Sequence, residues 1–333
     1  MAWYYILLIC AGAAALLLFA LAIIVDKVAF GARCDKNPLL TYFEYSEADT
    51  AAIPVSVERG NEALNGYIYN LNGGKDLIIF CHGLGPGHIA YTTEVKFFCQ
   101  SGYTVLALDY RGCNLSSGKS IRGLYSGVDA VIAAVQFARG DERLKGRKIF
   151  TVGHSWGGYS ALCATKYVPV DGAVAISAPL TPVKTVYYPA SGSLTKPVAA
   201  LLCPFWYVIN AFKFGFRGNL NAAKCVKNSG VPALIIHGDG DTVVPLKISA
   251  YGQAEGDNIR KYLSVGKNHN PYNSPSAQKL MCELSARIAN LRKMSDEEKL
   301  YFKNFDYVAA TQEDGEVMNT ILRFLQDCDE CST

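Results

Sequence analysis

One serine in this sequence lies in a pattern that is typical of a nucleophile. Ser155 has glycine two positions before it and two positions after it, as Gly153 and Gly157. The apolar run at residues 149–152 predicts a strand, and residues 155–166 have the pattern of a helix. A serine on a tight strand-to-helix turn takes strained backbone angles, and small neighbours avoid clashes there. The pattern therefore predicts an exposed, nucleophilic hydroxyl at the edge of a sheet.

A serine hydroxyl needs a base that takes its proton, and the chain has only five histidines. Three of them adjoin a glycine at a predicted strand end, which assigns them to turns: His82, His154 and His237. His269 follows the last predicted strand in a polar loop, so we expect it to be the base. His88 lies in a loop with proline and glycine, and we expect it to line the substrate site.

The base in turn needs a carboxylate that orients the imidazole and stabilises its charged form. Asp239 and Asp241 both follow the predicted strand at residues 233–236, and the spacing alone leaves both open. We expect the other aspartate to bond within the turn. Asp-Gly-Asp also matches part of a calcium loop, but the remaining ligands are missing. The sequence predicts no metal site and no cofactor, because no G-x-G-x-x-G follows the first strand.

Acyl transfer also requires two N–H donors that stabilise a developing oxyanion. The main-chain N–H of Trp156, at the start of the predicted helix, is one candidate. Leu84 is the other, in the loop after the predicted strand at residues 77–81. Its neighbours Gly83 and Gly85 allow the backbone to approach a substrate closely.

The elements that would position these residues alternate along the chain. Five apolar runs without polar alternation predict strands buried on both faces: residues 77–81, 104–108, 149–152, 173–176 and 233–236. Helical patterns lie between them, at residues 94–101, 126–138, 155–166 and 246–253. Residues 53–59 and 64–69 add a predicted hairpin. This order predicts an α/β protein with a mostly parallel, doubly wound sheet.

Two segments interrupt the alternation. Residues 183–230 are too long for an ordinary connection and rich in aromatic residues, so they predict an inserted cap. We expect Phe205 and Trp206 in this cap to contact substrate, although packing within the cap is an equal alternative. Residues 276–311 predict a helical insertion before the last helix.

The N-terminus predicts a transmembrane anchor at residues 1–26. The first 25 residues carry no charge and would span about 37 Å as a helix, against about 30 Å for a bilayer core. A cleaved signal sequence would need a basic start and a shorter apolar core, and a buried core helix would be shorter. A linker and lead-in at residues 27–52 and a catalytic domain at residues 53–333 complete the predicted organisation.

Charge predicts the sidedness and excludes one class of partner. Lys27, Arg33 and Lys36 follow the predicted span and no basic residue precedes it, so we expect a single-pass membrane protein whose catalytic domain faces the cytoplasm. Eleven scattered cysteines, an odd number, favour the same side. The net charge of +3 and the lack of a Lys/Arg run argue against a nucleic-acid partner.

The motifs together resemble those of the α/β-hydrolase superfamily, over roughly residues 53–325. The matching segments are residues 82–85 (His-Gly-Leu-Gly), 109–112 (Asp-Tyr-Arg-Gly), 153–158 (Gly-His-Ser-Trp-Gly-Gly), 237–245 and 268–269 (Asn-His). They are most similar to membrane-anchored serine hydrolases of the Bem46 type and to serine aminopeptidases. The resemblance implies an α/β-hydrolase fold and a Ser-His-Asp triad. It also implies that Asp241, which precedes Thr-Val-Val-Pro, is the acid.

This resemblance implies a serine hydrolase that cleaves carboxylic esters through an acyl-enzyme. The aromatic cap and the anchor favour apolar or lipid-like acyl groups. Two alternatives remain. The same triad could serve a peptidase or amidase, or the fold could be a non-catalytic, anchored binding protein. Relatives with an aspartate or a cysteine as nucleophile, such as dehalogenases and dienelactone hydrolases, are disfavoured by Ser155.

Overall fold

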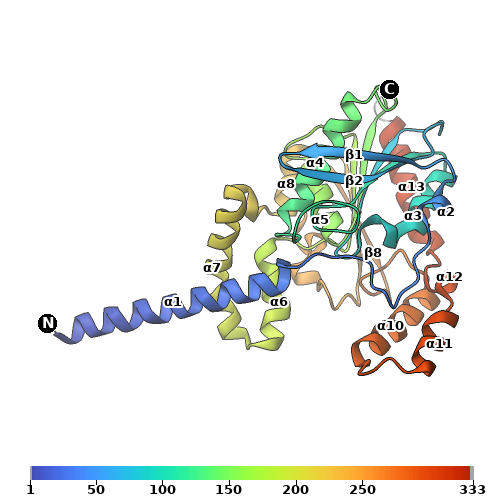
Figure 1. Ribbon diagram of the computed structural model, residues 1–333. Helices are drawn as coiled ribbons and strands as arrows, with labels where there is room; N and C mark the ends of the chain where they lie inside the picture. Colours follow the sequence, from blue (N-terminus) through green and yellow to red (C-terminus); the bar gives the residue numbers. More distant parts are fainter. Residues whose placement is uncertain (1, 331–333) are drawn as a thin grey trace.

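A computed structural model describes residues 2–330. Met1 of the predicted anchor and residues 331–333 of the predicted domain lie outside the described residues. Within these, eight strands form one sheet in the order β1-β2-β4-β3-β5-β6-β7-β8 (Figure 1). The strands are β1 (Ile53–Arg59), β2 (Glu62–Tyr69), β3 (Leu77–Cys81), β4 (Thr104–Leu108), β5 (Ile149–His154), β6 (Gly172–Ile176), β7 (Ala233–Gly238) and β8 (Ile259–Ser264). β2 runs antiparallel to both of its neighbours, and the other pairs are parallel.

Helices cover both faces of this sheet, which explains the continuous apolar runs. In β3, Leu77 and Ile79 join one core while Ile78 and Phe80 join the other. The first core lies under α4 (Tyr125–Gly140), α5 (Trp156–Ala164) and α8 (Ala222–Ser229). The second lies under α3 (Thr92–Gln100) and α13 (Gly315–Glu330). The predicted doubly wound α/β sheet is confirmed.

The helix expected at residues 246–253 is instead two short turns, η3 (Leu246–Ile248) and α9 (Ala250–Gln253). Ser249 separates them because its backbone is extended and its hydroxyl accepts a hydrogen bond from the Gly252 N–H, at 3.1 Å. This is an N-cap, which begins a new helix rather than continuing the old one.

The two insertions are helical. The segment after β6 contains α6 (Pro182–Ser193), α7 (Lys196–Phe214) and η2 (Gly215–Asn219). α8, which ends the predicted cap, packs on α5 and leads into β7, so it belongs to the sheet's helical layer. The later insertion consists of α10 (Pro275–Asn290), α11 (Asp296–Asn304) and α12 (Tyr307–Ala310), on the opposite side of the body from α7 (Figure 1).

Helix α1 (Ala2–Phe30) continues four residues beyond the predicted end of the anchor at residue 26. Its N-terminal part projects from the body, and its C-terminal part packs on α6 and α7 (Figure 1). It is a candidate membrane span by length and composition. Asp26, near its end, forms an ion pair with Lys213 of α7.

The predicted linker is held against the body. The Arg33 guanidinium donates to the carbonyl oxygens of Asn114, Ser116 and Gly118. Within residues 27–52 a short helix, α2 (Tyr45–Ala48), packs on α3. The projecting helix is therefore joined to the body without a free linker between them.

Candidate active site

The turn between β5 and α5 holds Ser155 in a strained conformation, with φ 53° and ψ −115°. The Ser155 N–H donates to the Ile176 carbonyl of β6 at 2.7 Å, which fixes the turn to the neighbouring strand. A Cβ on Gly157 would lie 1.8 Å from the Cys81 carbonyl oxygen, and one on Gly153 would lie 2.4 Å from Gly157. Both positions therefore require glycine, as the spacing predicted.

The structure brings the three predicted triad residues together from the carboxyl ends of three strands. The Ser155 hydroxyl lies 2.9 Å from Nε2 of His269, in the loop after β8. Nδ1 of His269 lies 2.8 Å from Oδ2 of Asp241, in the loop after β7. With Nδ1–H donating to the carboxylate, Nε2 is left to accept the serine proton. This geometry suits general-base activation of a serine.

The surroundings of Asp241 keep its carboxylate ionised. Burial opposes ionisation, but the hydrogen bond from His269 and the N–H of Val244 outweigh it, so the pKa of Asp241 lies below its usual value. Oδ1 accepts from the main-chain N–H groups of Val243 and Val244, each at 2.8 Å. Asp239, the alternative acid, instead accepts from the Gly266 N–H at 2.7 Å. Asp241 alone of the two contacts the imidazole.

The main-chain amides near the serine differ in whether a protein group already accepts their hydrogen bond. The Gly83 N–H donates to the Tyr91 hydroxyl at 3.0 Å, so this amide is already bonded. Among residues 2–330, no protein group accepts from the N–H of Leu84 or of Trp156. Both are therefore available to a substrate oxygen, and the Trp156 N–H lies at the N-terminus of α5, where the helix dipole favours negative charge.

A hydrogen-bond chain that the sequence did not reveal joins the loop that contains Leu84 to His269. Burial, together with His269, lowers the pKa of His154 to about 3, so this imidazole is neutral. Its Nε2–H donates to the His269 carbonyl at 2.9 Å, which leaves Nδ1 to accept from the Tyr91 hydroxyl at 2.9 Å. Tyr91 in turn accepts from the Gly83 N–H. His154 was expected only to form a turn, and Tyr91 had no sequence signal because this contact exists only in the folded chain.

Replacing Tyr91 with phenylalanine removes the link in this chain while keeping the ring. The Gly83 N–H and Nδ1 of His154 then lose their partners, and we expect kcat to fall about tenfold, which corresponds to about 1.4 kcal/mol of the cost of these two lost hydrogen bonds. KM should change little, because the loss is in positioning. Steady-state kinetics on a soluble ester would measure this. Tyr262→Phe is the control, since its hydroxyl bonds only the exposed Glu316; equal kinetics in both variants would contradict the prediction.

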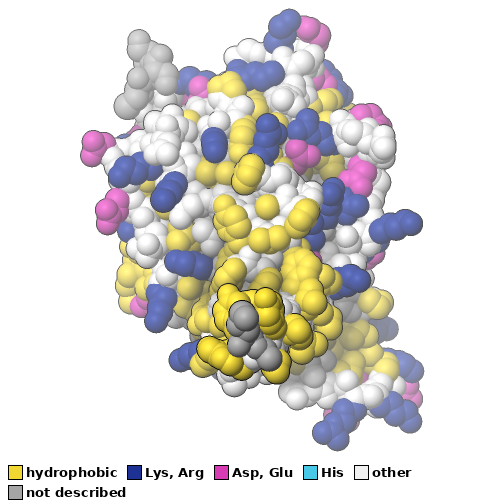
Figure 2. Space-filling view, turned by 90° about the vertical axis from the view of Figure 1, so that its left-hand side faces the viewer, with side chains coloured by type: hydrophobic (Ala, Val, Ile, Leu, Met, Phe, Trp, Pro, Cys, Tyr) yellow, Lys and Arg dark blue, Asp and Glu magenta, His cyan; other side chains and the backbone are white. Residues whose placement is uncertain are grey.

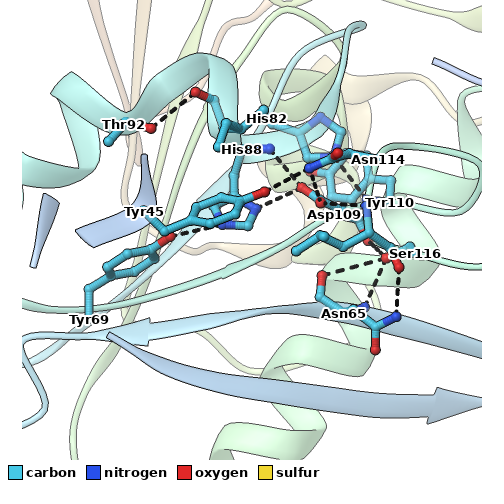
Figure 3. A network of polar contacts seen from close by, with 12 residues as sticks. Tyr45, Asn65, Tyr69, His82, His88, Thr92, Asp109, Tyr110, Asn114 and Ser116 are labelled. Carbon is cyan, nitrogen blue, oxygen red and sulfur yellow. Dashed lines mark hydrogen bonds and ion pairs between the residues drawn. The ribbon is translucent and has the colours of Figure 1, made fainter. Parts of the chain in front are cut away.

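A second buried network surrounds Asp109, at the end of β4 (Figure 3). Its Oδ1 accepts from the main-chain N–H of His88 at 2.7 Å and from Nδ1 of the same residue at 2.6 Å. Nε2 of His88 lies 2.9 Å from the Tyr69 hydroxyl. His88 is 1 % exposed, so the expectation that it lines the substrate site is wrong. Its two ring nitrogens are both bonded, and it fixes the end of the Leu84 loop instead.

Phe205 and Trp206, the two cap residues expected to contact substrate, both pack toward α1. The Trp206 side chain is buried, and its indole N–H donates to the Ala22 carbonyl of α1 at 3.1 Å. The Phe205 ring packs against Phe19, with 5.9 Å between ring centres. Both aromatic residues therefore join the cap to α1. The reason is that α1 does not end at the body surface but continues across the cap.

Glu94 on α3 is a buried carboxyl that should make stability depend on pH. Burial, reinforced by the nearby Glu313, raises its pKa from 4.5 to about 8. Between these values the folded state keeps a proton that the unfolded chain releases, so stability falls as pH rises. Each unit of pKa difference corresponds to about 1.4 kcal/mol, so the free energy of unfolding falls by an amount on the order of a few kcal/mol.

Thermal unfolding of the full chain in detergent should therefore show a Tm that decreases from pH 5 to pH 8. The Glu94→Gln variant should show a flatter profile, because its side chain does not titrate. The exposed Glu283 provides the matched variant Glu283→Gln, which should retain the slope of the unchanged protein. If Glu94→Gln keeps that slope as well, another group causes the dependence.

Comparison with known proteins agrees with this architecture. Residues 74–229 match the family described as serine aminopeptidase, S33. Human protein ABHD12B is 30% identical over 191 residues, which cover 53% of this chain and 49% of that protein. The 2-hydroxy-6-oxononadienedioate/2-hydroxy-6-oxononatrienedioate hydrolase of Klebsiella pneumoniae is 28% identical over 129 residues, or 38% of this chain and 43% of that enzyme. The chain thus spans less than half the length of these two relatives.

Among solved structures, an esterase of Pyrococcus furiosus superposes with a TM-score of 0.56 at 20% identity, covering 77% of this chain and 96% of the esterase. A likeness at this level of identity establishes the fold. The sheet order, the strained serine turn and these matches define an α/β-hydrolase fold. Over part of its length, the chain also resembles hydrolases in sequence.

Proposed function

We propose that this protein is a membrane-anchored serine hydrolase that cleaves carboxylic esters. The observation that carries the proposal is the continuous hydrogen-bonded set of Ser155, His269 and Asp241 beside two unpartnered amides. Each group has the partner that its role requires: the ionised carboxylate contacts the imidazole, and the imidazole contacts the partly exposed serine hydroxyl.

The proposed reaction follows from these positions. His269 takes the proton of Ser155 as the serine oxygen adds to the ester carbonyl carbon. The N–H groups of Leu84 and Trp156 stabilise the negative charge that develops on the carbonyl oxygen. His269 then gives the proton to the departing alcohol, which leaves an acyl-serine. Water, deprotonated by the same histidine, releases the carboxylic acid and restores Ser155.

A fluorophosphonate probe tests this proposal, because it modifies only a serine that is activated in this way. We expect the folded full chain to be labelled at Ser155, with peptide mass spectrometry locating the adduct. The Ser155→Ala variant should give no signal under the same conditions. Equal labelling of the two proteins, or none of the folded chain, would exclude this function.

A peptidase or amidase is the second candidate, and the match to the serine aminopeptidase family over residues 74–229 favours it. The same triad can cleave amides when the histidine protonates the amine leaving group efficiently. A panel that pairs p-nitrophenyl esters of increasing acyl length with aminoacyl and prolyl p-nitroanilides separates the two functions. We expect higher kcat/KM on the esters, rising with acyl length; a preference for the anilides would favour the peptidase.

We also propose that α1 is a single-pass anchor and that the catalytic domain faces the cytoplasm. Lys27, Arg33 and Lys36 at the body end of the helix support this orientation. Protease protection in sealed membranes tests it. Added protease should cleave the domain in microsomes, whose cytoplasmic face points outward, and should leave it intact in spheroplasts, whose external face does. The opposite pattern would reverse the orientation.

A further inference from the structure

Helix α7 is apolar on both of its long faces. One face is buried against α1 and the body, through Ala199, Leu202, Trp206 and Ile209. The opposite face is exposed, and the residues that form it are Pro197, Ala200, Leu201, Pro204, Tyr207, Val208 and Phe212. Residues 197–212 carry no charged side chain. A surface helix of a soluble protein normally presents charged or polar residues to water, so this exposed stripe requires an apolar partner.

We propose that this stripe of α7 lies in the apolar boundary of the same bilayer that α1 spans, so that the cap is a second membrane contact. The proposal rests on the anchoring role proposed above for α1. The occupant is lipid rather than a protein because the stripe is continuous with a candidate membrane span. α7 packs directly on the C-terminal part of α1, joined by the Trp206–Ala22 hydrogen bond and the Lys213–Asp26 ion pair.

The surface around α1 has the composition expected at a membrane boundary. Figure 2 looks onto the N-terminal end of α1, and hydrophobic side chains surround the helix and continue outward from it, while Lys and Arg side chains lie above this area and to its sides. The exposed Lys196 precedes the uncharged stretch of α7, and the exposed Phe216 and Arg217 follow it in η2, whereas Lys213 is held by Asp26. Basic side chains at the ends of an apolar stripe can extend toward lipid headgroups.

This contact would place the active site at the membrane surface. The cap follows β6, and the carbonyl of Ile176 at the end of β6 holds the Ser155 N–H. α6 and α7 therefore emerge from the edge of the sheet that carries the triad. A bilayer against the stripe would present esters of long-chain lipids to this edge without their passage through water. The inferred substrate class is thus a membrane-resident lipid ester.

A tryptophan introduced into the stripe can report the contact directly. Phe212 is 83% exposed, and the Phe212→Trp full chain would be reconstituted in phosphatidylcholine vesicles with or without brominated acyl chains. Bromine quenches tryptophan only on contact, so we expect most of the fluorescence added by this substitution to be quenched. Leu300→Trp on α11, 58% exposed and distant from α1, is the matched control and should not be quenched.

Fluorescence of the unsubstituted chain, which has three tryptophans, is subtracted. Partial quenching of that native signal, to which the exposed Trp3 of α1 contributes, verifies insertion of the anchor. Added fluorescence of Phe212→Trp that stays unquenched while the native signal is partly quenched would overturn the inference. This readout does not use catalysis, so it remains valid if the protein proves not to hydrolyse esters.

Charge in the stripe tests the consequence for activity. Val208→Asp/Phe212→Asp should lower hydrolysis of a long-chain ester embedded in vesicles about tenfold more than hydrolysis of soluble p-nitrophenyl acetate, because a carboxylate resists the apolar boundary. Leu300→Asp/Val308→Asp, on α11 and α12, should lower both rates equally or not at all. An equal effect of the stripe variant on both substrates would contradict delivery of substrate from the bilayer.

Discussion

Replacing Ser155 with alanine is expected to lower kcat for ester hydrolysis by about a millionfold, the size of effect seen when the nucleophile of a serine hydrolase is removed. The substitution deletes one oxygen, the atom that lies 2.9 Å from Nε2 of His269. His269 then has no hydroxyl to deprotonate, and no acyl-enzyme can form. Only binding and the amides of Leu84 and Trp156 remain to favour attack by water.

The comparison should be made at saturating ester, with KM measured alongside. KM should stay within a few-fold of its original value, because the alanine keeps the turn and leaves the substrate contacts in place. Ser160→Ala is the control, since its hydroxyl lies one turn further along α5 and donates only to the Trp156 carbonyl. Retention of more than a hundredth of the activity by Ser155→Ala would mean that another group is the nucleophile.

The residues most readily predicted were those on which local rules act strongly. The strained turn at Ser155 restricts residues 153 and 157 to glycine, and this restriction is visible in the sequence. Fully buried parallel strands require uninterrupted apolar runs, so the core strands were also predicted within a few residues. In both cases the constraint comes from a few neighbouring residues.

The residues that were not predicted depend on distant segments. Trp206 looked like a substrate contact because an aromatic residue in a cap is compatible with either role. Only the position of α1, which is 184 residues away in the sequence, shows that the indole bonds to Ala22. The expectation for His88 was wrong for a similar reason, since the buried Asp109 that binds it follows β4, 21 residues away in the sequence. Pairings of this kind leave no periodic pattern in the sequence.

The second large effect on kcat is expected from a substitution at one of the two aspartates after β7. Spacing left Asp239 and Asp241 open, and the structure separates them by their hydrogen bonds. Asp241→Asn is expected to lower kcat about ten-thousandfold. The asparagine oxygen is retained at the Oδ1 position by the N–H groups of Val243 and Val244, so its NH2 group must face His269.

That orientation forces a change of tautomer. Facing an amide donor, Nδ1 of His269 must accept, which moves the ring proton to Nε2, and a protonated Nε2 cannot accept the proton of Ser155. Asp239→Asn is the matched control. Its carbonyl oxygen can still accept from Gly266, so its kcat should stay within about threefold of the unchanged protein. If Asp239→Asn were instead the slower variant, the carboxylate contact to His269 would not be the one used in the reaction, and the acid would have to reach the imidazole from the other side of the turn.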